Sequence, residues 1–294
     1  MMKYLSILFI LSLNLVVRAQ QQIGLSLRVN GEMNDSVYAD EPVLFKLTIA
    51  HSAAQNAMAW NAANSRRVSE LDELMNTRKI TRDEYDKEKR KLDSSRKSFS
   101  PIQLGTGSNP WYNNIAWTVL DLNNGPSLVI RPSLLPYPKT ESALLVEENS
   151  YFVVAFGLSP EMISRMREGK MEIFLSIGKD KSNKVELVIS KAGLPPSKLT
   201  EDRLYKRGNY FSYARNPEQM KIVGDKILAL NPTSIDGMLL KADALYLQKS
   251  LKESLAAYRK ALKEFYKQMG TSEPPEYILA AISKLEDEIG KPGN

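Results

Sequence analysis

A period of 34 residues runs through positions 201–268 and constrains the fold of this chain more than any other feature. Stepping 34 positions leads from Leu204 to Met238, and the same step leads from Gly208 to Ala242. Large and small apolar residues therefore recur in phase. A period of this size is typical of helix–turn–helix units that stack and bury their apolar faces against one another.

Helix-starting residues divide this region into five predicted helices between residues 200 and 290. Side-chain oxygens, prolines in the first turn and Ser/Glu pairs spaced by three residues are the usual signals. The predicted starts are Thr200, Asn216 with Pro217, Thr233, the capping box of Ser250 and Glu253, and the stretch 273–276. Residues 193–199 are rich in proline and form a linker in front of the first helix.

The second of the two units resembles a tetratricopeptide (TPR) repeat. The family's packing positions hold Met238, Ala242, Leu245, Leu251, Tyr258, Ala261 and Leu262. The first unit is a more distant match, because Met220 and Gly224 occupy its small and aromatic positions in the reverse order of size. The apolar stripe of residues 278–289 suits a helix that covers the end of the stack.

The resemblance to TPR proteins implies a concave groove that binds an extended peptide or a partner helix. Carried over by position, the groove residues are Asp202, Tyr205, Asn209, Ser212, Tyr213, Asp236, Leu239, Asp243, Tyr246 and Leu247. Some TPR proteins hold a C-terminal carboxylate with a lysine and an asparagine one turn apart. Tyr205 stands where that lysine would be, so this mode of binding is not predicted.

Residues 20–192 are predicted to form a β-sandwich, because their apolar period is two. Val43, Phe45 and Leu47 alternate with Leu44 and Lys46. Such alternation is typical of strands with one face toward a core. Similar segments follow, separated by turns such as 123–126 and by a short helix begun by Ser159. Seven to nine short strands favour an antiparallel sandwich, and the pattern resembles immunoglobulin-like or fibronectin-like domains of exported bacterial proteins.

A helical hairpin is predicted within the sandwich region, at residues 61–99. Thr81 and Glu84 form a capping box, and Ile80 with Tyr85 forms a hydrophobic staple. The string LDELMNTRKITRDEYDKEKRKLD resembles the SHOCT module, although its usual glycine is missing and the module is usually terminal. The resemblance implies an interaction or oligomerisation element. Two roles stay open: an elaboration of the sandwich edge, and self-association of the chain.

Residues 1–19 are predicted to be a secretory signal peptide. Lys3 precedes an apolar run from Tyr4 to Val17, and Val17 and Ala19 occupy the positions read by signal peptidase. The run is shorter than the roughly 20 residues of a membrane-spanning helix. With no cysteine in 294 residues, the chain has no disulfide framework and no lipid-bearing cysteine. The expected location is the periplasm or the outer surface of a Gram-negative bacterium.

The composition argues against several classes of activity. One histidine, His51, excludes a multi-histidine metal site, and the absence of cysteine excludes thiolate metal sites and cysteine nucleophiles. At the end of a predicted strand, His51 is expected to be a surface or packing residue rather than a member of a catalytic triad. Removing Lys3 and Arg18 with the signal lowers the net charge from +6 to +4, and the basic residues are scattered, so nucleic acid is not an expected partner. No cofactor, metal site or enzymatic activity is predicted.

The sequence therefore predicts a multidomain β + α protein: a sandwich with an inserted hairpin, a linker, and a TPR-like helical domain at residues 200–290. Its expected function is that of an exported scaffold or adaptor that binds another protein of the cell envelope. The alternative is carbohydrate binding or surface adhesion through Trp111 and Tyr112, because a flat exposed aromatic pair can stack on a sugar. The other interpretation of that pair is packing over the end of the sandwich.

Overall fold

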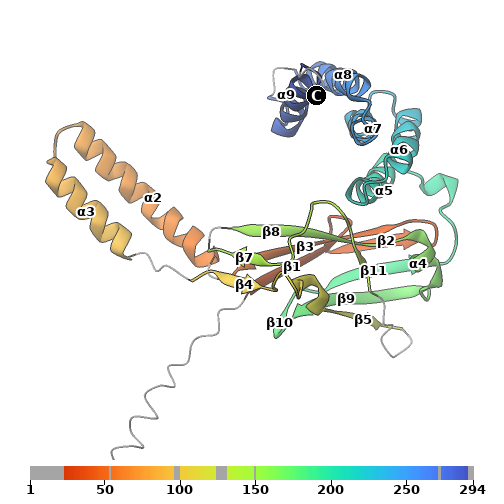
Figure 1. Cartoon of the computed structure of the whole chain (residues 1–294), viewed down its shortest axis with the longest axis horizontal. Coiled ribbons are helices and arrows are strands. Elements are labelled where there is room, and N and C mark those ends of the chain that lie inside the picture. Colours follow the sequence, from red (N-terminus) through yellow and green to blue (C-terminus); the bar gives the residue numbers. More distant parts are fainter. Residues whose placement is uncertain are drawn as a thin grey trace, which may run out of the picture.

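The computed structural model describes residues 23–52, 54–95, 100–123, 131–148, 150–270 and 273–290, with the side chains of 54–63 and 95 left aside. The predicted signal peptide lies outside these residues. The described chain consists of a β region followed by helices, with a helical hairpin inserted into the β region (Figure 1). This order is the one predicted from the sequence.

The first sheet contains four antiparallel strands in the order β1 (Ile23–Val29), β3 (Val43–His51), β8 (Tyr151–Leu158) and β6 (Ser133–Leu134). β3 is its central long strand and pairs along its length with β1 and β8. β6 is short and covers only the end of β8.

The second sheet contains β10 (Asp180–Lys181), β9 (Gly169–Ile177), β11 (Val185–Ser190) and β2 (Asn34–Tyr38), with β5 (Ile115–Asp121) on the other edge of β9. The prediction of a purely antiparallel sheet is wrong at β2, which pairs with β11 in parallel. β2 enters this sheet from the first one, since it follows β1 after a short turn. Within this sheet it runs in the same direction as β11.

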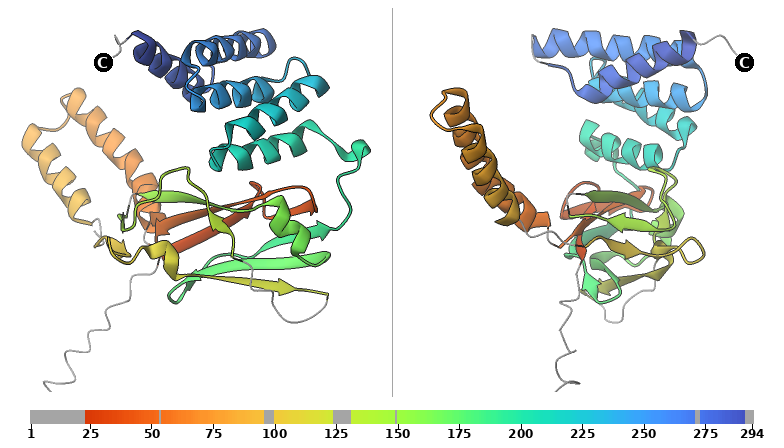
Figure 2. Two further views of the ribbon diagram at one scale, coloured as in Figure 1. Left: turned by 45° about the vertical axis from the view of Figure 1, so that its right-hand side comes forward. Right: turned by 60° about the vertical axis from the view of Figure 1, so that its left-hand side comes forward.

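The hydrophobic core of the β region lies between the two sheets (Figure 2). Val43, Phe45 and Leu47 are fully buried, as their alternation predicts. The indole of Trp117 lies between two phenylalanine rings, with its ring centre 5.4 Å from those of both Phe45 and Phe156. These contacts join the sheets, and a small third sheet of β4 (Ile102–Leu104) and β7 (Leu144–Val146) packs at one end.

The inserted hairpin consists of α2 (Ala54–Asn76) and α3 (Arg82–Ser95) and projects away from the sheets (Figures 1 and 2). The predicted capping box is confirmed: the Thr81 N–H donates to Glu84 Oε2 over 2.8 Å, and the Glu84 N–H donates to Thr81 Oγ1 over 3.3 Å. The predicted start at residue 61 is wrong by seven residues. Apolar spacing first becomes helical near Val68, and the alanine- and asparagine-rich stretch before it has no such period.

The C-terminal part contains α5 (Glu201–Tyr213), α6 (Pro217–Leu230), α7 (Ile235–Leu247), α8 (Leu251–Met269) and α9 (Glu276–Gly290). Within its described residues these are the five α-helices that the capping signals predict. They stack in sequence, each packed against the next, and α9 closes the end of the stack (Figure 1).

Two of the predicted helix starts need correction. Ser234, not Thr233, caps α7 by accepting from the Gly237 N–H over 3.2 Å. The Thr233 hydroxyl donates instead to Asn231 Oδ1 over 2.9 Å. Ser250 precedes α8 without a side-chain capping bond, because its ψ of 66° departs from the extended backbone usual at that position. Thr200 and Asn216 cap α5 and α6 as predicted.

Part of the outer face of the first sheet is covered by α5. Leu44 faces away from the core between the sheets, yet it is only 1% exposed. It belongs to a second apolar cluster in which Leu44, Leu135 and Ala155 pack with Leu204 and Tyr210 of α5. Full burial of a leucine-sized side chain contributes about 1.5–3 kcal/mol. The helical part is therefore docked on the β region through a shared apolar core.

We expect Gly157→Val to disturb this docking. A Cβ at Gly157 would lie 2.5 Å from Cε2 of Tyr210 and 3.1 Å from Cδ2 of Leu135. Overpacking of this kind costs about 1–3 kcal/mol, and denaturant unfolding of the full chain measures the loss. The control is Gly24→Val, where an added Cβ meets only the Ala50 carbonyl at 3.7 Å. Equal stability of the two variants would contradict the docking of α5 at this face.

Candidate protein-binding site

The inner helices α5 and α7 place seven of the ten predicted groove residues in two hollows. The first hollow, here called the tyrosine pocket, has a volume of about 290 Å³ and contains Ser212, Asp243, Tyr246 and Leu247. The second, the sheet-side pocket, has a volume of about 270 Å³ and contains Asp202, Tyr205 and Asn209. The predicted residues therefore line surface that is open to a partner at two places.

The other three predicted residues have different positions. Leu239 is 6% exposed and belongs to the apolar core between the last helices, so its predicted role in a groove is wrong. Helix α9 packs there and covers it. Tyr213 contacts the β region, with Lys46 Nζ 4.8 Å from its ring centre. Asp236 is exposed; burial raises the pKa of Tyr277 on α9, and the charge of Asp236 adds to this rise.

The tyrosine pocket is built by both parts of the protein. Tyr137, from the segment after β6, forms one wall, while Lys284 of α9 lies among the residues that complete the lining. The Tyr137 N–H donates to the Tyr213 carbonyl over 3.1 Å, which ties this segment to the end of α5. The guanidinium of Arg215 lies 4.5 Å from the Tyr137 ring centre. A partner in this pocket would contact the β region and the helices together.

Sequence reasoning missed Tyr137, Arg215 and Lys284. No local pattern connects Tyr137 to helices that begin more than 60 residues later in the chain. Arg215 had a detectable signal, since the 34-residue period places Lys249 at the equivalent position. Lys284 lies on the helix predicted to cap the stack, whose polar face was not considered.

Asp243 is a half-buried carboxylate in the lining of the tyrosine pocket. Burial raises its pKa, whereas the hydroxyl of Tyr258, which donates to Asp243 Oδ1, and the charge of Arg215 act in the opposite direction. Burial and the neighbouring carboxylate likewise raise the pKa of Tyr258. The hydroxyl therefore stays protonated and holds the carboxylate on the floor of the pocket.

Cations surround the ring of Tyr246 at the mouth of the pocket. Lys284 Nζ lies 5.0 Å and Lys249 Nζ 5.7 Å from the ring centre. The hydroxyl of Tyr246 donates to Glu288 Oε1 over 3.1 Å. A hydrogen bond to Tyr246 and the charge of Glu288 raise the pKa of Lys284, and they outweigh the opposing charge of Arg215. Lys284 is therefore a stable cation at neutral pH.

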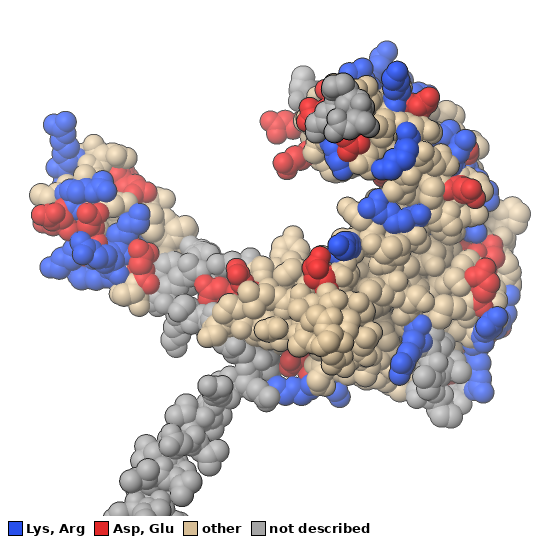
Figure 3. Space-filling view, viewed as in Figure 1, with Lys and Arg blue, Asp and Glu red and all other residues tan. Residues whose placement is uncertain are grey.

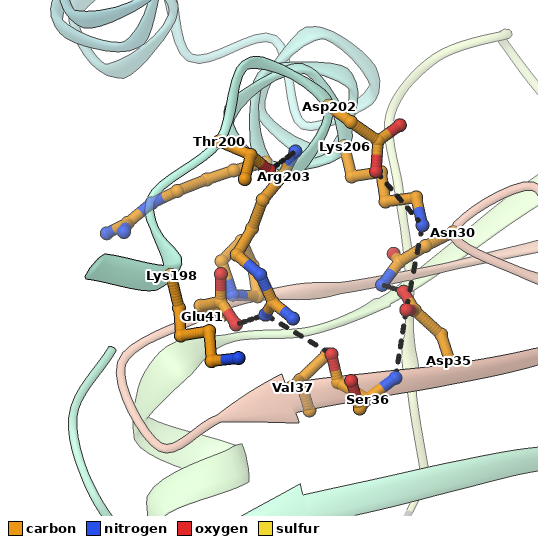
Figure 4. A pocket seen from close by; sticks show the side chains of 12 residues that line it. Asn30, Asp35, Ser36, Val37, Glu41, Lys198, Thr200, Asp202, Arg203 and Lys206 are labelled. Carbon is orange, nitrogen blue, oxygen red and sulfur yellow. Dashed lines mark hydrogen bonds and ion pairs between the residues drawn. The ribbon is translucent and has the colours of Figure 1, made fainter. Parts of the chain in front are cut away.

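A third hollow, of about 220 Å³, lies where α5 meets β2 and the segment after it (Figure 4). Arg203 forms an ion pair with Glu41, which is 4% exposed, and also donates to the Ser36 carbonyl over 3.2 Å. Lys206 Nζ lies 3.6 Å from Asp35 Oδ1. Charges of both signs already pair here, so this hollow serves mainly to orient α5 on the β region.

Glu41 depends on its arginine because it is buried. Burial raises the pKa of the carboxyl, while the Tyr38 N–H and Arg203 lower it. Removing one member of a buried ion pair typically costs about 3–5 kcal/mol, because the other charge is left without a partner. The pair thus fixes the orientation of α5, but it adds less net stability than the apolar contacts beside it.

The aromatic pair proposed for sugar binding has no flat exposed face. Trp111 is 1% exposed, and its Nε1–H donates to the Glu141 carbonyl over 3.0 Å. Tyr112 is half-buried and meets the Trp111 ring nearly edge-on at an interplanar angle of 77°. Packing over the end of the β region is therefore the role of Trp111. His51 is 2% exposed, with Nε2 3.2 Å from the Ser100 carbonyl.

The hairpin and the helical part rise from the β region on either side of a concave surface (Figure 3). Lys, Arg, Asp and Glu side chains are frequent over both flanks, whereas the strands between them present a largely uncharged surface. On this face the charged side chains of the two helical elements therefore border an uncharged stretch of the β region.

Comparisons with known proteins found no matching family model, no similar curated protein and no similar solved structure. Among the residues that the structure describes, no helix is both long and apolar enough to cross a membrane. The same residues contain no group of three or more His, Asp or Glu side chains placed to hold a metal ion.

We expect Asp243→Asn to change how stability depends on pH. Because the pKa of Asp243 is raised above its ordinary value of 3.8, the folded state binds the proton more tightly than the unfolded chain. Stability therefore falls as pH rises from about 3.8 through the raised pKa. Asparagine removes this titration but keeps an oxygen that can accept from Tyr258. The free energy of unfolding of the variant, relative to the original chain, should increase between about pH 4 and pH 7.

Denaturant unfolding at a series of pH values measures this difference. Asp287→Asn is the matched control, because it removes the same charge from an exposed position on α9. The control should show a much weaker trend. If the stability of Asp243→Asn relative to the original chain stays constant or falls with rising pH, burial does not raise the pKa of this carboxyl.

Proposed function

We propose that this chain is a non-enzymatic, exported scaffold or adaptor that binds a segment of another protein of the bacterial cell envelope. Binding takes place on the inner face of the helical part, along α5, α7 and α9. One observation supports this proposal above the others: the tyrosine pocket is lined by Tyr137 of the β region together with residues from all five C-terminal helices.

The chemistry of this face suits a protein segment. Tyr205 and Tyr277 are 40% and 57% exposed, and tyrosine provides a large contact area with a polar tip. Burial raises the pKa of Tyr277, and the negative charge of Asp236 adds to this rise, so the Tyr277 hydroxyl stays protonated and can donate to a partner. A partner that follows this surface would meet aromatic rings and charged groups in alternation.

The remaining assignments belong to the same proposal. The helical part is a short TPR-like stack of two units and a capping helix, and the β region is an immunoglobulin-like sandwich. Residues 1–19 direct export. The SHOCT-like hairpin is an interaction element, and its self-association stays a prediction. Among its described side chains, Leu71 and Tyr85 are the buried apolar ones. The hairpin projects from the sheets, so it has a surface available for such contacts.

Carbohydrate binding is the less supported function. It rested on Trp111 and Tyr112, and the burial of Trp111 removes the flat surface that stacking on a sugar needs.

Site-specific photo-crosslinking tests the proposed groove. Tyr277→p-benzoylphenylalanine places a crosslinker of similar shape on the inner face, and Tyr266→p-benzoylphenylalanine places the same group on α8, where Tyr266 is 44% exposed. In cells that make this protein, we expect a discrete protein adduct at position 277 and none at position 266.

The identity of the adduct matters less than its position. Adducts of equal yield at both positions, or no adduct at position 277 under conditions that crosslink a control complex, would contradict a binding groove on the inner face.

A further inference from the structure

Arg215 and Lys249 occupy positions where the backbone favours glycine. Their φ angles are +54° and +65°, and they follow the ends of α5 and α7 exactly one 34-residue period apart. The surrounding hydrogen bonds are also equivalent: the Asn216 N–H donates to the Phe211 carbonyl over 2.9 Å, and the Ser250 N–H to the Leu245 carbonyl over 3.0 Å. Glycine is the usual residue at this point after a helix.

A basic side chain therefore stands at both positions despite a conformational cost. Residues held in the left-handed region cluster at functional sites, where the side chain is needed for another reason. Both side chains lie at the same end of the groove. Arg215 stacks on the ring of Tyr137, and Lys249 approaches the ring of Tyr246.

Lys284 of α9 adds a third cation at this end. Its Nζ lies 5.0 Å from the centre of the Tyr246 ring, the same ring that Lys249 approaches. Arg215 and Lys284 both line the tyrosine pocket, and the charge of Arg215 acts to lower the pKa of Lys284. Two like charges that share one pocket repel, and an anion between them relieves that repulsion.

The carboxylates nearby do not balance these cations. Asp243 accepts a hydrogen bond from Tyr258, and Glu288 accepts one from Tyr246 and lies 4.0 Å from Lys284 Nζ. In the part of the chain that the structure describes, neither Arg215 nor Lys249 forms an ion pair. Three cations thus face two carboxylates, both of which already accept hydrogen bonds.

We propose that the groove binds an acidic segment of its partner protein, and that an aspartate or glutamate side chain of this segment enters the tyrosine pocket between Arg215 and Lys284. This inference rests on the proposed function and specifies the partner's chemistry. A volume of about 290 Å³ admits one or two side chains rather than a whole helix. The tyrosine rings contact the carbon atoms of the entering side chain, and the cations contact its carboxylate.

A positional-scanning library of ten-residue peptides tests the proposal on the purified full chain. Both ends of each peptide are blocked by acetylation and amidation, so that a carboxylate is present only in side chains. Pools with glutamate or aspartate fixed at one position should bind at least about tenfold more tightly than pools with glutamine or asparagine there. The advantage should decrease steeply with salt, because it depends on charge.

Arg215→Gly is the decisive variant. It removes the cation and places the favoured residue at φ +54°, so its melting temperature should be unchanged or higher by about 2 °C, while the preference for acidic pools is lost. Lys284→Gln should reduce the same preference. Lys263→Gln, an exposed position on α8 outside the pocket lining, is the charge-matched control and should retain the preference.

The outcomes separate this inference from the proposed function. Equal binding of glutamate and glutamine pools, a preference for lysine pools, or an acidic preference that survives Arg215→Gly would overturn it, although crosslinking at position 277 could still succeed. Binding that appears only with a free C-terminal carboxylate, or only on vesicles of anionic lipid, would also overturn it. Absence of both peptide binding and crosslinking would overturn the two proposals together.

Discussion

The packing of α5 on the outer face of the first sheet is the interaction on which the rest of this structure depends. One side of α5 contributes Leu204 and Tyr210 to an apolar cluster with Leu44 and Ala155 of the β region. The helix also begins the stack that contains the predicted binding surface. Because α5 belongs to both parts, the tyrosine pocket can take a wall from each of them.

Two kinds of interaction act at this junction, and their magnitudes differ. Each fully buried apolar side chain contributes about 1.5–3 kcal/mol. The pair of Arg203 and Glu41 is partly offset by the cost of removing both charges from water. Apolar burial therefore supplies most of the stability, and the ion pair mainly selects one orientation. This division explains how a surface rich in charged residues can still form a fixed interdomain contact.

The periodic features of the sequence predicted a β region followed by helices, and long-range contacts account for what they missed. Alternation identified Phe45 and Leu47 as core residues, and the 34-residue period identified the helices. By the same alternation, Leu44 looks like a solvent-facing residue. Helix α5, which covers it, begins more than 150 residues later in the chain, so no local pattern indicates that Leu44 is buried. The parallel pairing of β2 was missed for a similar reason, since no local pattern reports a change of sheet.

The candidate site was predicted in part. The groove positions implied by the resemblance to TPR proteins include Ser212, Asp243 and Tyr246, which line the tyrosine pocket. They also include Leu239, which α9 covers. Tyr137 could not be inferred from a helical repeat, because it lies in another part of the fold. Arg215 was within reach, since comparison of the two repeats shows a basic residue where a helix commonly ends in glycine.

The most direct test of this account is the distance distribution between the two parts of the chain. The protein has no native cysteine, so spin labels at Ser26→Cys on β1 and Lys252→Cys on α8 report that distance without interference in pulsed electron paramagnetic resonance. Docking through apolar burial predicts one narrow distribution that stays narrow in 1 M salt, where the screening length is about 3 Å. A broad distribution, or one that broadens when salt is added, would contradict the claim that the shared apolar core holds the helical part on the β region and so forms the tyrosine pocket.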